Sequence, residues 1–230
     1  MAVYLHMVIS AQSIPVTFET TNGIVVDESY IGDSGVTVAI AADPDTSGGD
    51  HGQTGKSTTD TTGAAWQNTQ IFFQEGSNYA DFTTNKVITF ECYSTVAFDG
   101  LLKLESSLNG QAPVQTTFQH TGGGWESVTV DFTTVGANDE FKKIVFFPYS
   151  TSTAGTFLTQ TEIDAMGNFD YYLDNITADV GTVIATPAPS AAATAPTANA
   201  ADVVSVYSDH YTPTATTVAW HPSWGQATSY

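Results

Sequence analysis

Carboxylates are the most abundant side chains of this chain that could do chemistry. Its 230 residues include 24 acids, five lysines and no arginine, which gives a formal net charge of −19. Three of the acids lie where a structural cation could sit: Glu19 near the start, Asp50 in a glycine-rich segment and Asp174 in the last aromatic segment. Carboxylates and loop carbonyls form the hard-oxygen cage that calcium prefers. The spacing alone nevertheless favours three solvated surface acids.

Two short motifs imitate nucleophile or phosphate-binding signatures but lack essential parts. Residues 32–35, GDSG, match the nucleophile motif of trypsin-like proteases, yet only His6 and Asp27 precede it as partners. Residues 50–57, DHGQTGKS, imitate a phosphate-binding loop in which Asp50 replaces the first glycine. Its charge would repel a phosphate, and no helical pattern follows to supply the helix N-terminus. Neither motif predicts an active site.

A third motif, EIDAMG at residues 162–167, resembles the catalytic strand of family 16 glycoside hydrolases. Retaining hydrolysis needs two carboxylates about 5 Å apart. Gly167 stands where the general acid would be, so we expect no catalysis. The scattered histidines form no zinc motif. The single cysteine, Cys92, excludes an intramolecular disulfide and is expected to be a buried, inert thiol.

Residues 85–132 contain the clearest structural pattern, four short runs with apolar residues on alternate positions. Ile88, Phe90 and Cys92 fall on one face, whereas Glu91 and Tyr93 fall on the other. Alternation with period two predicts strands that bury one face. Strands at this spacing, without helical patterns between them, predict an all-β antiparallel sandwich or jelly roll.

Further strands are expected at residues 14–20, 25–30, 36–41, 64–73, 141–149 and 171–180. Residues 43–63 predict a polar loop with at most a short strand, and residues 74–84 and 150–168 predict further loops. No segment shows a convincing amphipathic helix. The strongly acidic surface disfavours nucleic acid and anionic membranes, because affinity for both comes mainly from Lys and Arg. No segment is long and apolar enough for membrane insertion.

The composition divides the chain into four parts. Residues 1–13 resemble the back half of a signal peptide without its basic start, which favours a secreted or cell-surface protein. Residues 14–182 form the expected sandwich. Residues 183–201, rich in Pro and Ala, predict an extended linker. Residues 202–230 are too few to fold alone, so we interpret them as the start of a second module or a packed tail.

Several short segments resemble calcium-binding β-sandwich carbohydrate-binding modules of families 4, 6 and 22, of the kind attached to marine bacterial polysaccharide-degrading enzymes. They are TFET, AAW, LLKLE, GWESVTVDF and YYLDNIT. The resemblance implies a structural calcium held by Glu19 and Asp174, with Asp50 as a third ligand. It also implies that Trp66 lines a sugar-binding cleft. The tail resembles the start of another such module.

A sugar ring stacks its apolar face on an aromatic ring, while its hydroxyls need polar partners at the rim. Trp66 is the first candidate platform, with edge packing as the alternative. Glu91 and Tyr93 share the non-core face, and Lys103 and Gln115 join them if the strands pair suitably. Trp125 is expected to cap the core. The sequence thus predicts non-catalytic binding of a neutral, β-glucan-like polysaccharide, with a catalytic domain on the full-length chain as the expected partner. The alternative is a structural or adhesive surface module without a sugar site.

Overall fold

The computed structural model describes residues 14–185. The expected signal remnant, most of the linker and the C-terminal tail lie outside these residues. Within the described part, no helix is long and apolar enough to cross a membrane.

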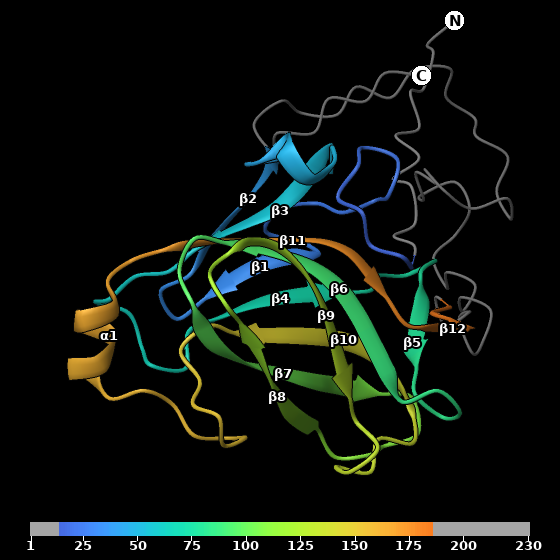
Figure 1. Ribbon diagram of the computed structural model, residues 1–230. Coiled ribbons are helices and arrows are strands. Elements are labelled where there is room, and N and C mark those ends of the chain that lie inside the picture. Colours follow the sequence, from blue (N-terminus) through green and yellow to red (C-terminus); the bar gives the residue numbers. More distant parts are fainter. Residues whose placement is uncertain (1–13, 186–230) are drawn as a thin grey trace, which may run out of the picture. The chain divides into compact units, whose positions relative to one another are not determined.

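Two antiparallel sheets pack face to face as a β-sandwich with one short helix (Figure 1). The five-stranded sheet has the order β2-β3-β11-β6-β9, with bounds Thr37–Ala42, Gln53–Thr58, Asp170–Thr177, Val87–Ser94 and Gly124–Asp131. The seven-stranded sheet contains β1, β4, β5, β7, β8, β10 and β12, with bounds Tyr30–Asp33, Asn68–Phe72, Asn78–Asp81, Phe98–Ser107, Val114–His120, Glu140–Phe147 and Asp179–Val183. The helix α1 is Gln160–Met166. The predicted all-β sandwich is confirmed.

The alternating block at residues 85–132 forms β6, β7, β8 and β9. On β6, Ile88, Phe90 and Cys92 are buried, whereas Glu91 and Tyr93 are only partly buried. The four strands do not form one sheet. β6 pairs with β9 and β11, while β7 pairs with β8 and β10 of the opposite sheet. The alternation therefore predicted which side of each strand faces the core. It did not predict which strands pair, because that depends on contacts between residues far apart in the sequence.

Five local expectations were wrong. The segment at residues 14–20 is not a strand and makes only an isolated bridge between Val16 and Ile176. The strand expected at residues 25–30 is a turn with an isolated bridge at Val26, and β1 begins only at Tyr30. The polar segment at residues 43–63 contains the full strand β3, and the expected loop at residues 74–84 contains β5. The expected loop at residues 150–168 contains α1. Polar, glycine-rich or short sequence concealed β3, β5 and α1, which tertiary contacts support.

Between the sheets lies a core rich in aromatic residues. Phe90 makes edge-to-face contacts with Phe118 and Phe146, which belong to the opposite sheet. A chain of hydroxyls also crosses the core. It runs from Tyr30 to Ser57, then to Thr69 and Tyr171, with O···O distances of 2.8, 2.8 and 2.6 Å. Each buried hydroxyl thereby finds a partner, which avoids the cost of burying it unpaired.

Helix α1 begins with a capping box. The Thr159 side chain accepts from the backbone N–H of Glu162, and the Glu162 carboxylate accepts from the Thr159 backbone. This arrangement satisfies two backbone donors at the helix start. The carboxylates of the EIDAMG motif, Glu162 and Asp164, are exposed on this helix, where Glu162 serves as a cap. At the other end of the sandwich, Ile184, which follows β12, is buried and belongs to the core.

Candidate functional site

Three aromatic side chains form a row across the outer face of the five-stranded sheet. Tyr172 of β11 pairs with Tyr93 of β6, and Tyr93 pairs with Trp125 of β9. Directly paired residues of neighbouring strands place their side chains on the same face. The Tyr93 ring centre lies 5.7 Å from that of Tyr172 and 5.6 Å from that of Trp125. All three are partly buried, and we call them the aromatic row.

Polar groups flank this row. Lys56 of β3 pairs with Tyr172, and its ammonium lies 5.7 Å from the centre of the Tyr172 ring. The same ammonium is 2.8 Å from a carboxylate oxygen of Asp170. Glu91 lies two residues from Tyr93 on the same face. The surface therefore offers apolar ring area beside charged hydrogen-bonding groups.

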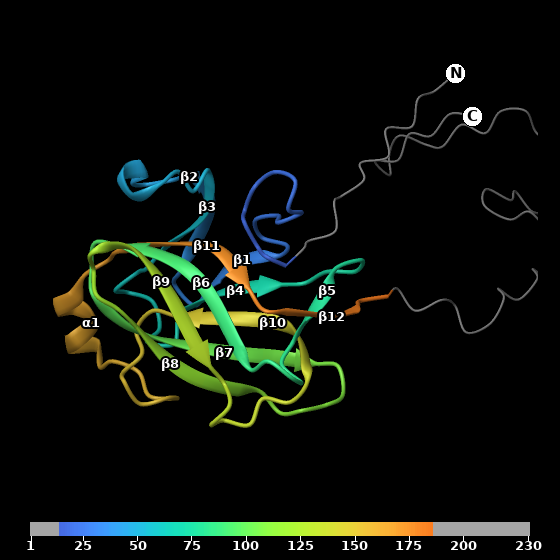
Figure 2. The same ribbon diagram turned by 45° about the vertical axis from the view of Figure 1, so that its right-hand side comes forward.

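The connection between β2 and β3, residues 43–52, reaches one end of the row. The His51 ring stacks on the Trp125 indole with a centroid distance of 3.8 Å and an angle of 17°. Asp43 Oδ1 accepts from Trp125 Nε1 at 2.9 Å, and Asp43 Oδ2 accepts from the His51 backbone at 2.9 Å. The loop thus holds both the ring plane and the polar edge of Trp125. Figure 2 shows the β2–β3 hairpin rising away from β6 and β9.

The three acids expected to bind a cation line one pocket of about 330 Å³, together with Thr17, His51, Gly52 and Asn175. We call it the acidic pocket. Glu19 Oε1 accepts from the Gln53 backbone at 2.8 Å, and Asp50 Oδ1 accepts from the Gly52 backbone at 2.8 Å. Within residues 14–185, no three His, Cys, Asp or Glu side chains are already arranged as a metal-ligand set. The donors nevertheless fit calcium in chemical type, because all three are carboxylates.

Asp174 is the buried member of this pocket, with 3% of its surface exposed. Its Oδ2 is hydrogen-bonded to His51 Nδ1 at 3.2 Å, whereas its Oδ1 is buried and has no hydrogen-bond partner. Burial raises the pKa of Asp174 to about 6, although hydrogen bonds from Asn175 and His51 oppose the rise; the nearby Glu19 adds to it. A buried, unpaired carboxylate oxygen beside a second acid is a place where a cation would lower the free energy.

The structure brings only some of the predicted sugar-site residues together. Glu91 and Tyr93 share the row's face, as expected. Lys103 and Gln115 are a directly paired couple, but they lie on β7 and β8 of the opposite sheet and do not neighbour Glu91 and Tyr93. Trp66 is 58% exposed, so it does not pack in the core, and it lies in the loop that leads into β4.

Sequence reasoning missed part of the row. Trp125 was expected to cap the core, but it lies on the outer face against His51 and Tyr93. Tyr172 is also on this face, whereas Tyr149, which follows β10, is fully buried. The alternation of β9 contained a usable signal: Trp125 has the parity of the outward Ser127 and Thr129, opposite to the buried Val128.

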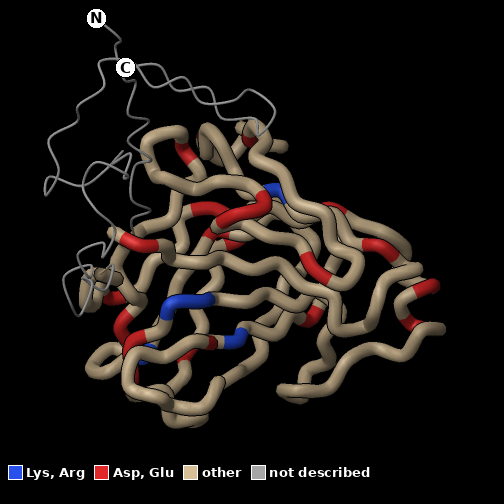
Figure 3. Tube along the Cα trace, turned by 180° about the vertical axis from the view of Figure 1, so that it is seen from behind, with Lys and Arg blue, Asp and Glu red and all other residues tan. Residues whose placement is uncertain are grey.

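The outer face of the seven-stranded sheet has a different character. Lys103 and Lys143 both contact Glu105, at 2.6 and 2.9 Å, and Lys143 lies over the Phe72 ring. Figure 3 shows acidic positions distributed over much of the trace and few lysine positions. The two lysines share this single carboxylate, so the cluster keeps one net positive charge.

No protein-family model matches this chain, and no curated protein matches it in sequence. An exo-β-agarase structure matches 69% of the chain with a TM-score of 0.46 and 12% identity; the match spans 24% of that enzyme. The family 11 carbohydrate-binding module of the Clostridium thermocellum cellulase Lic26A-Cel5E matches 65% of the chain with a TM-score of 0.38 and 13% identity, over 86% of its own length.

A third similar structure is CsCBM6-3 from Clostridium stercorarium in complex with cellobiose. It matches 66% of the chain with a TM-score of 0.32 and 13% identity, over 88% of its own length. The chain therefore has distant structural similarity to carbohydrate-binding modules and to part of an agarase. At TM-scores below 0.5 this similarity identifies neither ligand nor activity, so the function has to be inferred from the residues of the site.

Proposed function

We propose that this domain binds a neutral polysaccharide, without catalysis, on the outer face of its five-stranded sheet. The observation that carries the proposal is the aromatic row of Tyr172, Tyr93 and Trp125 beside Lys56, Asp170 and Glu91. Sugar rings stack their C–H faces on aromatic rings, while their hydroxyls bond to charged and amide groups. A row across several strands suits a ligand that is itself a chain of rings.

The charge balance supports a neutral polymer. With a net charge of −19, the chain repels anionic polymers such as alginate and nucleic acid. Lys56, the lysine beside the row, is already paired with Asp170. A β-glucan is therefore the first polymer class to test.

We further propose that calcium occupies the acidic pocket and stabilises the fold. Asp174, Glu19 and Asp50 would hold it, and the unpaired Asp174 Oδ1 supports this assignment. Calcium would supply a positive charge that compensates these carboxylates. The protein residues themselves fix the loop at residues 43–52 and thereby Trp125.

On this proposal the protein is secreted or displayed at the cell surface and concentrates an attached enzyme on its polymer. Such tethering raises the effective concentration of the enzyme without chemistry in the binding domain. A structural or adhesive module without a sugar site is the competing function.

Affinity electrophoresis against laminarin, xylan, agarose and alginate tests the proposal, with calcium present. Retardation by at least one neutral polymer, and none by alginate, is expected. No retardation by any neutral polymer would favour the structural or adhesive function. Retardation by alginate alone would contradict the charge argument.

A further inference from the structure

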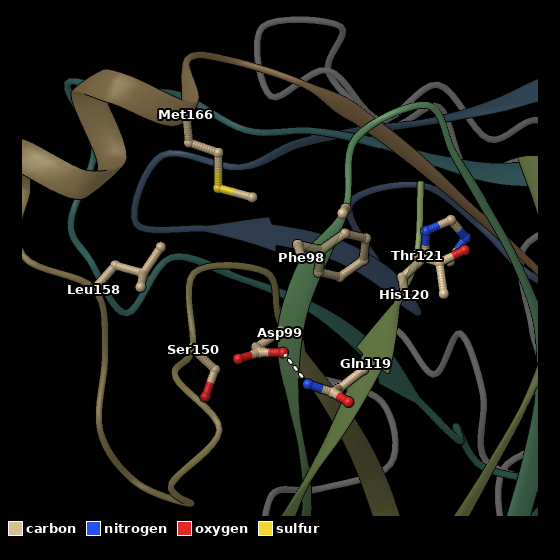
Figure 4. Close-up of a pocket in the computed structure, with 9 residues that line it drawn as sticks. Phe98, Asp99, Gln119, His120, Thr121, Ser150, Leu158 and Met166 are labelled. Carbon is tan, nitrogen blue, oxygen red and sulfur yellow. Dashed lines mark hydrogen bonds between the residues drawn. The ribbon is translucent and has the colours of Figure 1, made fainter. Parts of the chain in front are cut away.

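A second pocket, of about 440 Å³, opens at the end of the sandwich that α1 covers (Figure 4). It lies between the start of β7, the end of β8 and the segment around α1. Its volume falls in the range of small-molecule pockets. We call it the end pocket. It shares no lining residue with the acidic pocket or the aromatic row.

One side of the end pocket is apolar. Leu158 and Met166 come from the two ends of the α1 region, and Phe98 comes from β7. In Figure 4 the Met166 side chain extends from α1 toward the space beside Phe98. Phe98 is held in place by His120, whose ring is stacked at 5.4 Å and 18°. The apolar surface is therefore built on fixed side chains.

The other side presents a hydrogen-bonded pair. Asp99 Oδ1 accepts from Gln119 Nε2 at 2.8 Å. Within the described part of the chain, the second Asp99 oxygen and the Gln119 amide oxygen have no partner, and the Gln119 amide keeps one N–H. Two acceptors and one donor are thus available within a short distance of each other.

His120 also lines this pocket, but its ring nitrogens are already used. Nε2 lies 3.1 Å from the Cys92 and Gly124 carbonyl oxygens, and Nδ1 accepts from the Gly122 backbone at 3.0 Å. Both ring nitrogens thus have partners within the protein, and Nε2 also lies 3.8 Å from a carboxylate oxygen of Glu126. Asp99 is the carboxylate among the residues that line this pocket.

This lining discriminates between ligand classes. An anion would be repelled by Asp99, and no lysine lines the pocket. A wholly apolar ligand would desolvate the Asp99 carboxylate without a partner for it, which is costly. A neutral sugar unit meets both requirements: its C–H face covers Met166 and Leu158, and adjacent hydroxyls bond to Asp99 and Gln119.

We propose that the end pocket binds a single neutral sugar unit, as a second site separate from the aromatic row. The inference stands independently of the function proposed for the row.

Met166 provides a direct reporter. The full chain contains three methionines, so selective ¹³C-methyl labelling gives three signals, and Met166→Leu identifies the relevant one. Methyl β-glucoside, methyl β-galactoside and methyl β-xyloside are titrated in turn. At least one should shift the Met166 methyl signal in a saturable manner. Asp99→Ala and Gln119→Ala should weaken that binding about tenfold or abolish it.

Tyr93→Ala and the exposed-acid control Asp179→Ala should leave the Met166 titration unchanged. Conversely, Asp99→Ala should not affect polymer binding at the row, so the two proposals can fail separately. The hydrogen bond between Asp99 and Gln119 is at the surface, and matching thermal melts establish that the variants fold.

Three results would overturn the assignment. They are no Met166 shift with any glycoside, a shift that survives both Asp99→Ala and Gln119→Ala, and a shift with tetramethylammonium chloride in place of the glycosides. The last would identify a cation-binding pocket instead.

Discussion

Asp174 is the residue at which the acidic pocket and the aromatic row meet. Its Oδ2 is hydrogen-bonded to His51, which stacks on Trp125, while its Oδ1 faces no partner. Because burial raises the pKa of Asp174 above that of a free carboxyl, its ionisation between about pH 4 and pH 6 lowers the stability of the cation-free protein. A bound cation would remove this penalty.

Asp174→Asn should therefore have different effects on the stability of the cation-free protein and of the calcium-bound protein. With excess chelator at pH 7.5, the variant should melt at or above the temperature of the wild type, because a buried charge has been removed. With calcium, the wild type should gain stability and the variant should not. Thermal melts measure both, with the exposed Asp179→Asn as control. An equal calcium gain in Asp174→Asn would contradict its role as a ligand.

Gly52, which directly precedes β3, allows the Glu19 carboxylate to lie close to the backbone of the acidic pocket. Its φ is +66°, and a Cβ there would lie 2.1 Å from Glu19 Oε1. Gly136 also has a positive φ, +73°, but open space around it. Both Ala substitutions should cost about 1 kcal/mol for the left-handed backbone, and Gly52→Ala should cost more because it also displaces Glu19. Urea unfolding compares them. Equal losses of unfolding free energy in the two variants would show that displacing Glu19 does not destabilise the fold.

Some of these residues could be identified from sequence, and others could not. The alternation on β6 correctly placed Glu91 and Tyr93 on the outer face, because a strand's side chains alternate strictly. The same rule applied to β9 would have placed Trp125 outward. His51 could not have been assigned, since its contact with Trp125 depends on how the loop at residues 43–52 folds back.

At the scale of elements, the loop at residues 43–52 connects the acidic pocket with the aromatic row. It contributes Asp50, His51 and Gly52 to the acidic pocket and holds Trp125 through His51 and Asp43. Occupancy of the acidic pocket should therefore alter the surroundings of the Trp125 ring.

A variant that keeps Trp125 alone, with Trp66, Trp220 and Trp224 replaced by Phe, isolates this effect. Adding calcium to the chelated protein should change its fluorescence, and His51→Ala should reduce the change. A variant that keeps Trp66 alone serves as the control and should not respond. An unchanged Trp125 signal during a calcium-dependent rise in melting temperature would show that the loop does not connect the sites.

Asp139 fixes a different junction, between the β7–β8 connection and β10. It is buried and accepts backbone hydrogen bonds from Asn109, Gln111 and Glu140. Burial alone would raise its pKa, but the hydrogen bonds from Glu140, Asn109 and Gln111 outweigh it, so the pKa is lowered. The ionised carboxylate therefore stabilises the fold above the pKa of a free carboxyl, and this contribution is lost as the pH falls.

Asp139→Asn should cost about 2 kcal/mol of unfolding free energy at pH 7, in the range for hydrogen bonds to a charged group. The difference from the wild type should shrink as the pH falls from 5 toward 3. Urea unfolding at several pH values measures it. A cost that does not depend on pH would mean that the charge of Asp139 is unimportant.

For the whole molecule, the sequence predicted the sandwich but not its connectivity. Period-two alternation shows which side of a strand is buried and does not show which sheet the strand joins. For this reason Lys103 and Gln115 were expected near Tyr93, although β7 and β8 lie in the opposite sheet. The strand β3 escaped detection because its sequence, QTGKST, is polar; it is held between β2 and β11.

The charge distribution also acts on the whole molecule. Net negative charge disfavours anionic partners, and Lys56, the lysine beside the aromatic row, is paired with Asp170. A neutral polymer that binds by stacking and hydrogen bonding is compatible with this field. Salt should have little effect on such binding, because few charges are neutralised.

The most direct test of the proposed function compares three alanine variants in affinity electrophoresis on a polymer that retards the wild type. Tyr93→Ala and Trp125→Ala should each weaken binding about tenfold. Trp66→Ala should bind like the wild type, because Trp66 precedes β4 of the opposite sheet and is not part of the aromatic row. Melting temperatures confirm that each variant is folded. If Trp66→Ala abolishes binding while Tyr93→Ala and Trp125→Ala retain it, the polysaccharide does not bind to the aromatic row.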